Sequence, residues 1–115
     1  MRGVRRALAL LILLTVLSSL TAACEQDRSA PGLYKKNCAR CHGAHGEGPR
    51  KPVKLYPHLN LLSSPMVQKG DRAAVRHQIV DGDGPMPSFR RRLTPEETER
   101  LIDFTLQLPS RKAGT

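Results

Sequence analysis

The strongest feature of the hydrophobic pattern is a continuous apolar segment near the N-terminus. Three arginines precede it, and the 14 residues from Ala7 to Leu20 are almost uninterrupted in their apolar character. A basic start, a short apolar run and small residues before a cleavage point are typical of an export signal. A helix of this length spans about 21 Å, less than the ~30 Å apolar core of a bilayer. The pattern therefore favours a signal over residues 1–23 rather than a permanent transmembrane anchor.

The rest of the chain has the spacing of short helices and no alternating strand pattern. A helix is expected to begin at Ser29, whose hydroxyl is a cap candidate, with Pro31 in its first turn. Another short helix is expected over residues 64–69. A third is expected over residues 71–80, with an aspartate as its N-cap. The apolar stripe of that third helix contains Ala74, Val75 and Ile79.

The last helix has the clearest sequence signals. Thr94 and Glu97 have the spacing of a capping box, and Pro95 holds the first helical position. The apolar residues recur at helical spacing: Leu101, Phe104 and Leu108. Pro109 is expected to end the helix, which leaves a frayed tail. Before this helix, the glycine- and proline-rich residues 81–85 cannot continue a helix, so residues 86–89 are expected to be extended or in a turn.

Chain length indicates one small domain. Cleavage after residue 23 leaves 92 residues, with no tryptophan, two phenylalanines and two tyrosines. Small domains with so little aromatic surface are commonly stabilised by a metal, disulfides or a cofactor. The expected organisation is a signal over residues 1–23, a polar tether over 24–30, a domain over 31–108 and a flexible tail over 109–115.

The chain is basic, with a formal net charge of +9. Removal of the signal leaves 16 basic and 10 acidic residues, so the mature chain stays positive. Such a surface favours acidic partner proteins or anionic lipid. Nucleic acid is the other usual partner of a basic chain, but the export signal disfavours it, and none is predicted.

The predicted signal ends at a cysteine. The segment Leu20-Thr21-Ala22-Ala23-Cys24 resembles the lipobox of bacterial lipoproteins, although threonine holds the place where an aliphatic residue is usual. Ordinary cleavage after Ala23 is the alternative. Lipidation is favoured because this third cysteine otherwise has no partner in an oxidising compartment. Several acyl chains on Cys24 would anchor the protein to the membrane stably.

The pentapeptide Cys38-Ala39-Arg40-Cys41-His42 carries the most specific chemistry. Two thiols three positions apart lie on one side of a helical turn, so both can add to the vinyl groups on one edge of a porphyrin. The adjacent imidazole can then ligate the iron, as in a c-type haem attachment site. A redox dithiol or half of a zinc site is the alternative, but the chain has no second Cys-x-x-Cys to complete a zinc site.

A haem bound through His42 leaves a sixth coordination position for a ligand from well downstream. Met86 lies 44 residues later, between Pro85 and Pro87, and the two prolines restrict its backbone. A thioether is a soft iron ligand that raises the reduction potential relative to two imidazoles. Core packing is the alternative role for this methionine. The weaker candidates for the sixth ligand are Met66, His45, His58 and His77.

With these residues the chain resembles the class I (mitochondrial-type) cytochromes c, especially the small bacterial monohaem members. The resemblance rests on the Cys38–Gly43 motif, the later Met86-Pro87 and the helix over residues 93–108, and it covers about residues 30–108. It implies an all-α cytochrome c fold, with three to five short helices wrapped around one covalently bound haem c.

The resemblance also implies a role for each site residue. Cys38 and Cys41 would form the haem thioethers, and His42 and Met86 would be the axial iron ligands. The carbonyl of Pro57 would accept a hydrogen bond from Nδ1 of the proximal histidine, a contact that fixes the ring and raises its basicity.

The function expected from these features is that of a one-electron carrier in a bacterial respiratory or periplasmic redox chain. It would act freely or as a haem subunit of a larger oxidoreductase, on the periplasmic side of the membrane and held there by lipid. Basic residues at positions 35, 36, 40, 50, 51 and 54 would steer acidic redox partners, or would simply be solvated. The alternative function is a haem enzyme, or a gas or peroxide sensor, with a labile sixth ligand.

Overall fold

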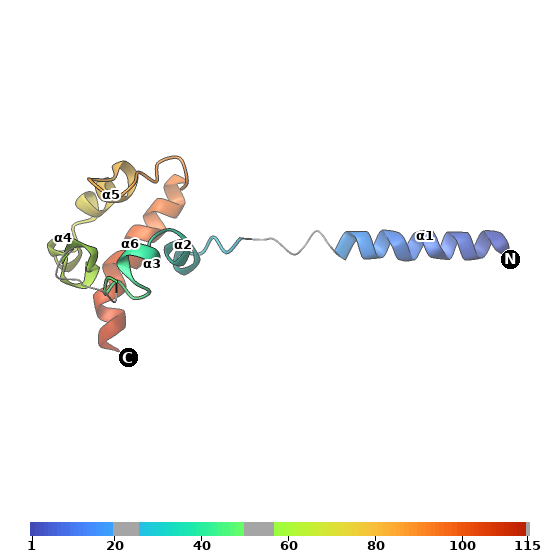
Figure 1. Ribbon diagram of the computed structural model, residues 1–115, viewed down its shortest axis with the longest axis horizontal. Helices are drawn as coiled ribbons and strands as arrows, with labels where there is room; N and C mark the ends of the chain where they lie inside the picture. Colours follow the sequence, from blue (N-terminus) through green and yellow to red (C-terminus); the bar gives the residue numbers. More distant parts are fainter. Residues whose placement is uncertain (20–25, 50–56, 115) are drawn as a thin grey trace.

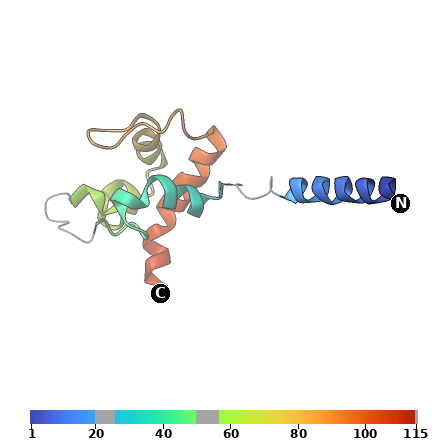
Figure 2. The ribbon, with the colours of Figure 1, turned by 45° about the vertical axis from the view of Figure 1, so that its right-hand side comes forward.

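The computed structural model describes residues 1–19, 26–49 and 57–114. The helices in these residues are α1 (Arg2–Ser19), α2 (Ala30–Asn37), α3 (Ala39–His42), α4 (Pro65–Gln68), α5 (Arg72–Asp81) and α6 (Pro95–Ala113), with 3₁₀ turns η2 (Pro57–Leu59) and η3 (Leu61–Ser63). In both views α1 lies apart from the other helices, which gather around α6 (Figures 1 and 2). The described part of the chain contains no strand, and the predicted all-α fold is confirmed.

The N-terminal helix bears on the predicted signal. Its 18 residues contain most of the apolar run. No helix within the described ranges is long and apolar enough to cross a membrane. Ala23 and Cys24, where the signal is predicted to end, lie outside the described residues.

Local caps fix where the helices of the domain begin. The side chains of Ser29 and Asp71 accept hydrogen bonds from backbone N–H groups three residues later, at 3.2 and 3.0 Å. Thr94 and Glu97 form a capping box, with N–H to side-chain distances of 2.9 and 3.2 Å. Each cap satisfies backbone donors that have no partner inside the helix. The predicted starts of α2, α5 and α6 are therefore confirmed.

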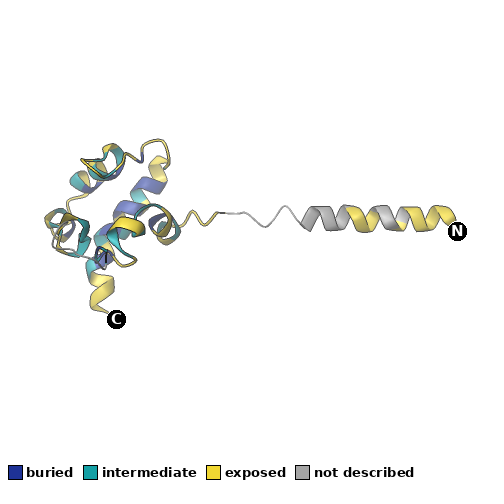
Figure 3. Ribbon diagram, in the orientation of Figure 1, coloured by how far each residue is buried: buried dark blue, intermediate teal, exposed yellow. Residues whose placement is uncertain are grey.

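The core lies between α6 and the shorter helices packed on it. Both α2 and α5 contact α6. Buried residues of α6 lie along the part of the helix beside them (Figure 3). The ring centroids of Tyr34 and Phe104 are 5.1 Å apart, which joins α2 to the middle of α6. The buried apolar residues are Leu33, Tyr34, Val67, Val75, Ile79, Phe89, Leu101, Ile102 and Leu108. The core formed by the described residues is therefore small.

The C-terminal end differs from the sequence prediction. Helix α6 continues through Pro109 to Ala113, so the expected helix end at Pro109 is wrong. Proline removes one backbone hydrogen bond and commonly kinks or ends a helix, yet the residues after Pro109 stay helical here. Side chains support this last turn, because Ser110 Oγ donates to the carbonyl of Gln107 at 2.9 Å. The guanidinium of Arg111 also lies 4.9 Å from the ring centroid of Phe104.

Part of the predicted tether is bonded to the domain. The guanidinium of Arg28 pairs with the carboxylate of Glu97 at the start of α6, with an Nη2–Oε2 distance of 2.6 Å. The ammonium of Lys36 on α2 donates to Gln26 Oε1 at 2.6 Å. Residues of the predicted tether therefore contact the domain that follows them.

Candidate functional site

The two cysteines of the Cys-x-x-Cys-His motif lie on one tight turn. Cys38 lies between α2 and α3, as the C-cap of the first helix and the N-cap of the second. Its carbonyl accepts hydrogen bonds from the backbone N–H groups of Cys41 at 3.1 Å and His42 at 2.9 Å. This turn brings both thiols to the same side of the backbone. Both are free; Cys38 is half-buried and Cys41 is exposed. The pair is therefore arranged for two attachments to one neighbouring group.

The ionisation of Cys38 helps to discriminate among the chemistries open to this motif. Burial, and then the nearby Cys41, raise the pKa of the Cys38 thiol to about 11. A redox dithiol reacts as the thiolate, which this environment disfavours at neutral pH. The surroundings of Cys38 are thus better suited to a neutral sulfur, such as a thiol or a thioether.

The orientation of His42 fits an iron ligand. Its Nδ1 lies 2.9 Å from the carbonyl oxygen of Leu59. Because a carbonyl only accepts hydrogen bonds, Nδ1 must carry the proton, and the lone pair of the neutral ring is on Nε2. That nitrogen is the one that a metal can use, and a bond from Nδ1–H to a carbonyl is the usual support of a ligating histidine.

The sequence prediction named the carbonyl of Pro57 as the acceptor of this hydrogen bond, but in the structure the acceptor is the carbonyl of Leu59. The carbonyl of Pro57 instead accepts the N–H of Asn60 at 3.2 Å. The carbonyl of Pro57 is thus already bonded within the 3₁₀ turn η2. The carbonyl of Leu59, two residues later, lies next to His42 instead. No residue type marks such an acceptor, because every residue has a carbonyl.

The backbone after His42 folds back and is fixed by several contacts. Gly43 has φ of +78°, and a Cβ there would lie 2.7 Å from the carbonyl oxygen of Gly48. The N–H of Gly48 donates to the His42 carbonyl at 2.8 Å. The buried Tyr34 donates its hydroxyl to the Gly43 carbonyl at 3.0 Å, and burial raises the pKa of this phenol. The turn that carries the motif is therefore tied to α2.

Met86 lies in a loop between α5 and α6. Asp83 and Met86 exchange two backbone hydrogen bonds of 3.1 and 3.0 Å, which confirms the expected turn. Gly82 has φ of +75°, and a Cβ on it would be 2.5 Å from the Met86 carbonyl oxygen and 2.8 Å from the N–H nitrogen of Ser88. The loop therefore folds tightly over this glycine.

The structure relates the motif and the loop through the core. Cys38 and Met86 are both partly buried and pack against the same apolar cluster. Met66, a weaker ligand candidate, packs against that cluster as well. His45, His58 and His77 are exposed. Cys24, the predicted lipidation site, lies outside the described residues.

These features together define a class of protein. An all-helical domain with a small core presents two cysteines on one turn and a histidine that keeps its Nε2 lone pair. This combination is that of a small haem-binding domain of the c type.

Comparison with known proteins identifies the family. Residues 25–104 match the family described as Cytochrome C oxidase, cbb3-type, subunit III. Cytochrome c6 of Picosynechococcus sp. is 33% identical over 104 residues, covering 85% of this chain and 87% of the relative. Cytochrome c6 of Synechocystis sp. is 31% identical over 104 residues, covering 87% and 82%. Cytochrome c6 of Gloeothece citriformis is 29% identical over 75 residues, covering 65% of this chain and 64% of the relative.

The chain belongs to the class I c-type cytochromes. It is an electron-transfer protein and not an enzyme, and it carries covalently bound haem c, typically one per chain. As an electron carrier it exchanges electrons with partner proteins. The haem supplies a metal that changes between two oxidation states, while the protein holds the group and limits access to it.

Proposed function

We propose that Cys38 and Cys41 hold the haem through thioethers, and that His42 and Met86 ligate its iron in both oxidation states. The Nδ1–H bond from His42 to the Leu59 carbonyl carries this proposal, because it directs Nε2 and not Nδ1 to a metal. The tight turn around Met86 supports its part, since a fixed backbone limits how far the thioether can move. With both axial positions filled, the iron can pass electrons without binding a substrate.

Substitution of the two half-buried methionines tests this assignment. Met86→Ala should remove the far-red charge-transfer band of methionine-ligated ferric haem and lower the reduction potential, because a soft ligand favours Fe(II). Met66→Ala removes the same side chain from a core position and should keep the band. A band that survives in Met86→Ala, or rapid carbon monoxide binding to the reduced wild-type protein, would contradict the assignment.

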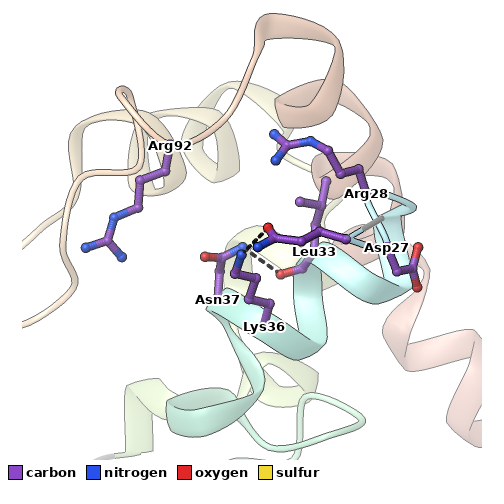
Figure 4. A pocket seen from close by; sticks show the side chains of 7 residues that line it. Asp27, Arg28, Leu33, Lys36, Asn37 and Arg92 are labelled. Atoms are coloured by element: carbon purple, nitrogen blue, oxygen red, sulfur yellow. Dashed lines mark hydrogen bonds between the residues drawn. The ribbon is translucent and has the colours of Figure 1, made fainter. Parts of the chain in front are cut away.

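We infer that redox partners with acidic surfaces dock on this chain near the haem attachment site. Lys35, Lys36 and Arg40 lie close to the two cysteines in the sequence, and Lys35 and Arg40 are exposed. Next to them is a hollow that Lys36 borders from α2 and Arg92 borders from the segment before α6 (Figure 4). Cations on both sides of such a hollow attract carboxylates and speed up association at low salt. Positions 50, 51 and 54 lie outside the described residues.

We also propose an exported, lipid-anchored protein on the periplasmic side of a bacterial membrane. Residues 1–23 would be the signal, Cys24 the acylated residue and residues 31–108 the cytochrome c domain. The basic start and apolar run of α1 support this organisation. Mass spectrometry of the protein isolated from membranes tests it, since haem, acyl chains and the cleavage site each have their own mass. A mature chain that starts at Cys24 without acyl groups would refute the anchor.

Within a bacterial respiratory or periplasmic redox chain, the carrier would act freely or as a haem subunit of a larger oxidoreductase. The description of the matched family, which names an oxidase subunit, supports the second arrangement. Affinity purification from gently solubilised membranes distinguishes the two. Stoichiometric recovery with an oxidoreductase supports a subunit, whereas recovery of the cytochrome alone supports a free carrier.

A further inference from the structure

We propose that Asp81 and Arg90 are positioning residues that close the base of the loop carrying Met86, and so keep this methionine at the iron. The inference rests on the proposed role of Met86 as an axial ligand. Asp81 is the last residue of α5, and Arg90 follows the loop. The guanidinium Nη2 of Arg90 donates to Oδ1 of Asp81, so this ion pair joins the two ends of residues 82–89.

The ion pair is one of three contacts that connect the two ends of the loop at its base. The N–H of Phe89 donates to the Ile79 carbonyl at 3.0 Å, and Ser88 Oγ donates to the Val80 carbonyl at 2.6 Å. These two hydrogen bonds use backbone carbonyls of the last turn of α5 as acceptors. Arg90 reaches back to α5 with a long side chain and is the charged member of the three.

A second side chain of α5 holds the carboxylate in place. Nδ1 of His77 lies 2.8 Å from Oδ2 of Asp81, so each carboxylate oxygen has its own partner. The hydrogen bond from Arg90, and then that from His77, hold the pKa of Asp81 below its ordinary value. Asp81 is therefore ionised at neutral pH and can retain the guanidinium.

The ion pair lies at the surface, so its loss would affect the ligation of the iron by Met86 and not the stability of the whole fold. The side chains of Asp81 and Arg90 are 38% and 65% exposed, so loss of the pair leaves the core intact. Within the loop, Met86 is bonded through its backbone only to Asp83, in a turn of four residues. Opening the base would let this turn move as a unit and carry the thioether away from the metal.

Competition by an external ligand measures this opening. Imidazole binds ferric haem only after the methionine has left, so its apparent affinity reports the population of the open loop. In the full holoprotein, Arg90→Gln and Asp81→Asn should each raise the imidazole affinity about 2- to 5-fold, the range expected for an exposed ion pair. The double variant should exceed neither single variant, because both remove the same contact.

Arg91→Gln is the matched control. It removes the same charge one residue later, and Arg91 forms no ion pair with any residue in the described ranges. Its imidazole affinity should equal that of the wild type, and Arg90→Lys should restore most of the wild-type value. Equal affinities for Arg90→Gln and Arg91→Gln would overturn the positioning role while leaving methionine ligation in place. Absence of the far-red band in the wild-type ferric protein would overturn the ligation, and this inference with it.

Discussion

The tight approach of Gly82 to the Met86 loop gives the sharpest test of how the backbone positions the sixth ligand. Gly82→Ala adds one methyl group at a residue with φ of +75°. The added Cβ would lie 2.5 Å from the carbonyl oxygen of Met86 and 2.8 Å from the N–H nitrogen of Ser88. Both neighbours are backbone atoms, so the clash cannot be relieved by rotating a side chain.

Two costs contribute to the expected destabilisation. Gly82 combines its positive φ with ψ of 173°, and a residue with a Cβ in this conformation costs about 1–3 kcal/mol. Overpacking against fixed atoms adds about 1–3 kcal/mol. Gly84→Ala separates the two costs, because Gly84 has φ of +54° in the same loop but a methyl group on it would meet nothing within 4 Å. We therefore expect a loss of about 2–6 kcal/mol for Gly82→Ala and of about 1–2 kcal/mol for Gly84→Ala.

Urea unfolding of the two holoproteins measures the free energies, and the far-red band of the ferric protein reports the methionine. Gly82→Ala should lose part or all of this band, because the loop must shift to accommodate the methyl group. Gly84→Ala should retain it. Equal destabilisation by the two substitutions would show that the close backbone contact contributes nothing beyond the positive φ. A full band in Gly82→Ala would refute the link between this contact and the ligand.

Three further predictions concern the helical domain and its surface. Arg28 lowers the pKa of Glu97, so the stability it provides is present above the ordinary glutamate pKa of about 4.3 and is lost as pH falls through the lowered value. Glu97→Gln should lower the melting temperature at pH 7 but not in strong acid; a constant difference would contradict this. Ile102 is 0% exposed, so Ile102→Ala should lower the free energy of unfolding in urea by about 2–5 kcal/mol. Substitution of the exposed Gln107 by alanine should lower it little. Lys36→Gln should slow reduction by an acidic redox partner in stopped-flow experiments and weaken its salt dependence; an unchanged salt slope would argue against docking there.

The parts of the fold that were predictable from sequence depend on contacts close in the chain. A cap needs only a side chain and an N–H group three residues later, and Ser29, Asp71 and Thr94 all behave as predicted. The Cys-x-x-Cys-His turn is similarly local. The prediction at Pro109 was wrong because one missing N–H is not sufficient to end a helix when packing of Arg111 on Phe104 supports the following turn.

Contacts between distant segments could not be predicted in the same way. Arg28 and Glu97 are 69 residues apart, and the chain offers many other arginine and glutamate pairs. The carbonyl that orients His42 belongs to Leu59 because a 3₁₀ turn has already used that of Pro57, a matter of one or two residues in backbone path. A family pattern locates such a contact approximately, and the backbone geometry then decides which carbonyl makes it.

Gln26 and Arg28 are bonded to the helical domain, and these bonds limit how far the domain could move from a lipid anchor on Cys24. Only Glu25 separates Gln26 from Cys24. Each residue extends a chain by at most about 3.6 Å, so an acylated Cys24 and Gln26 at the edge of the folded domain would be at most about 7 Å apart. Such a protein could tumble very little and could not cross a wide aqueous space. Its electron donor and acceptor would have to come to it at the same membrane surface.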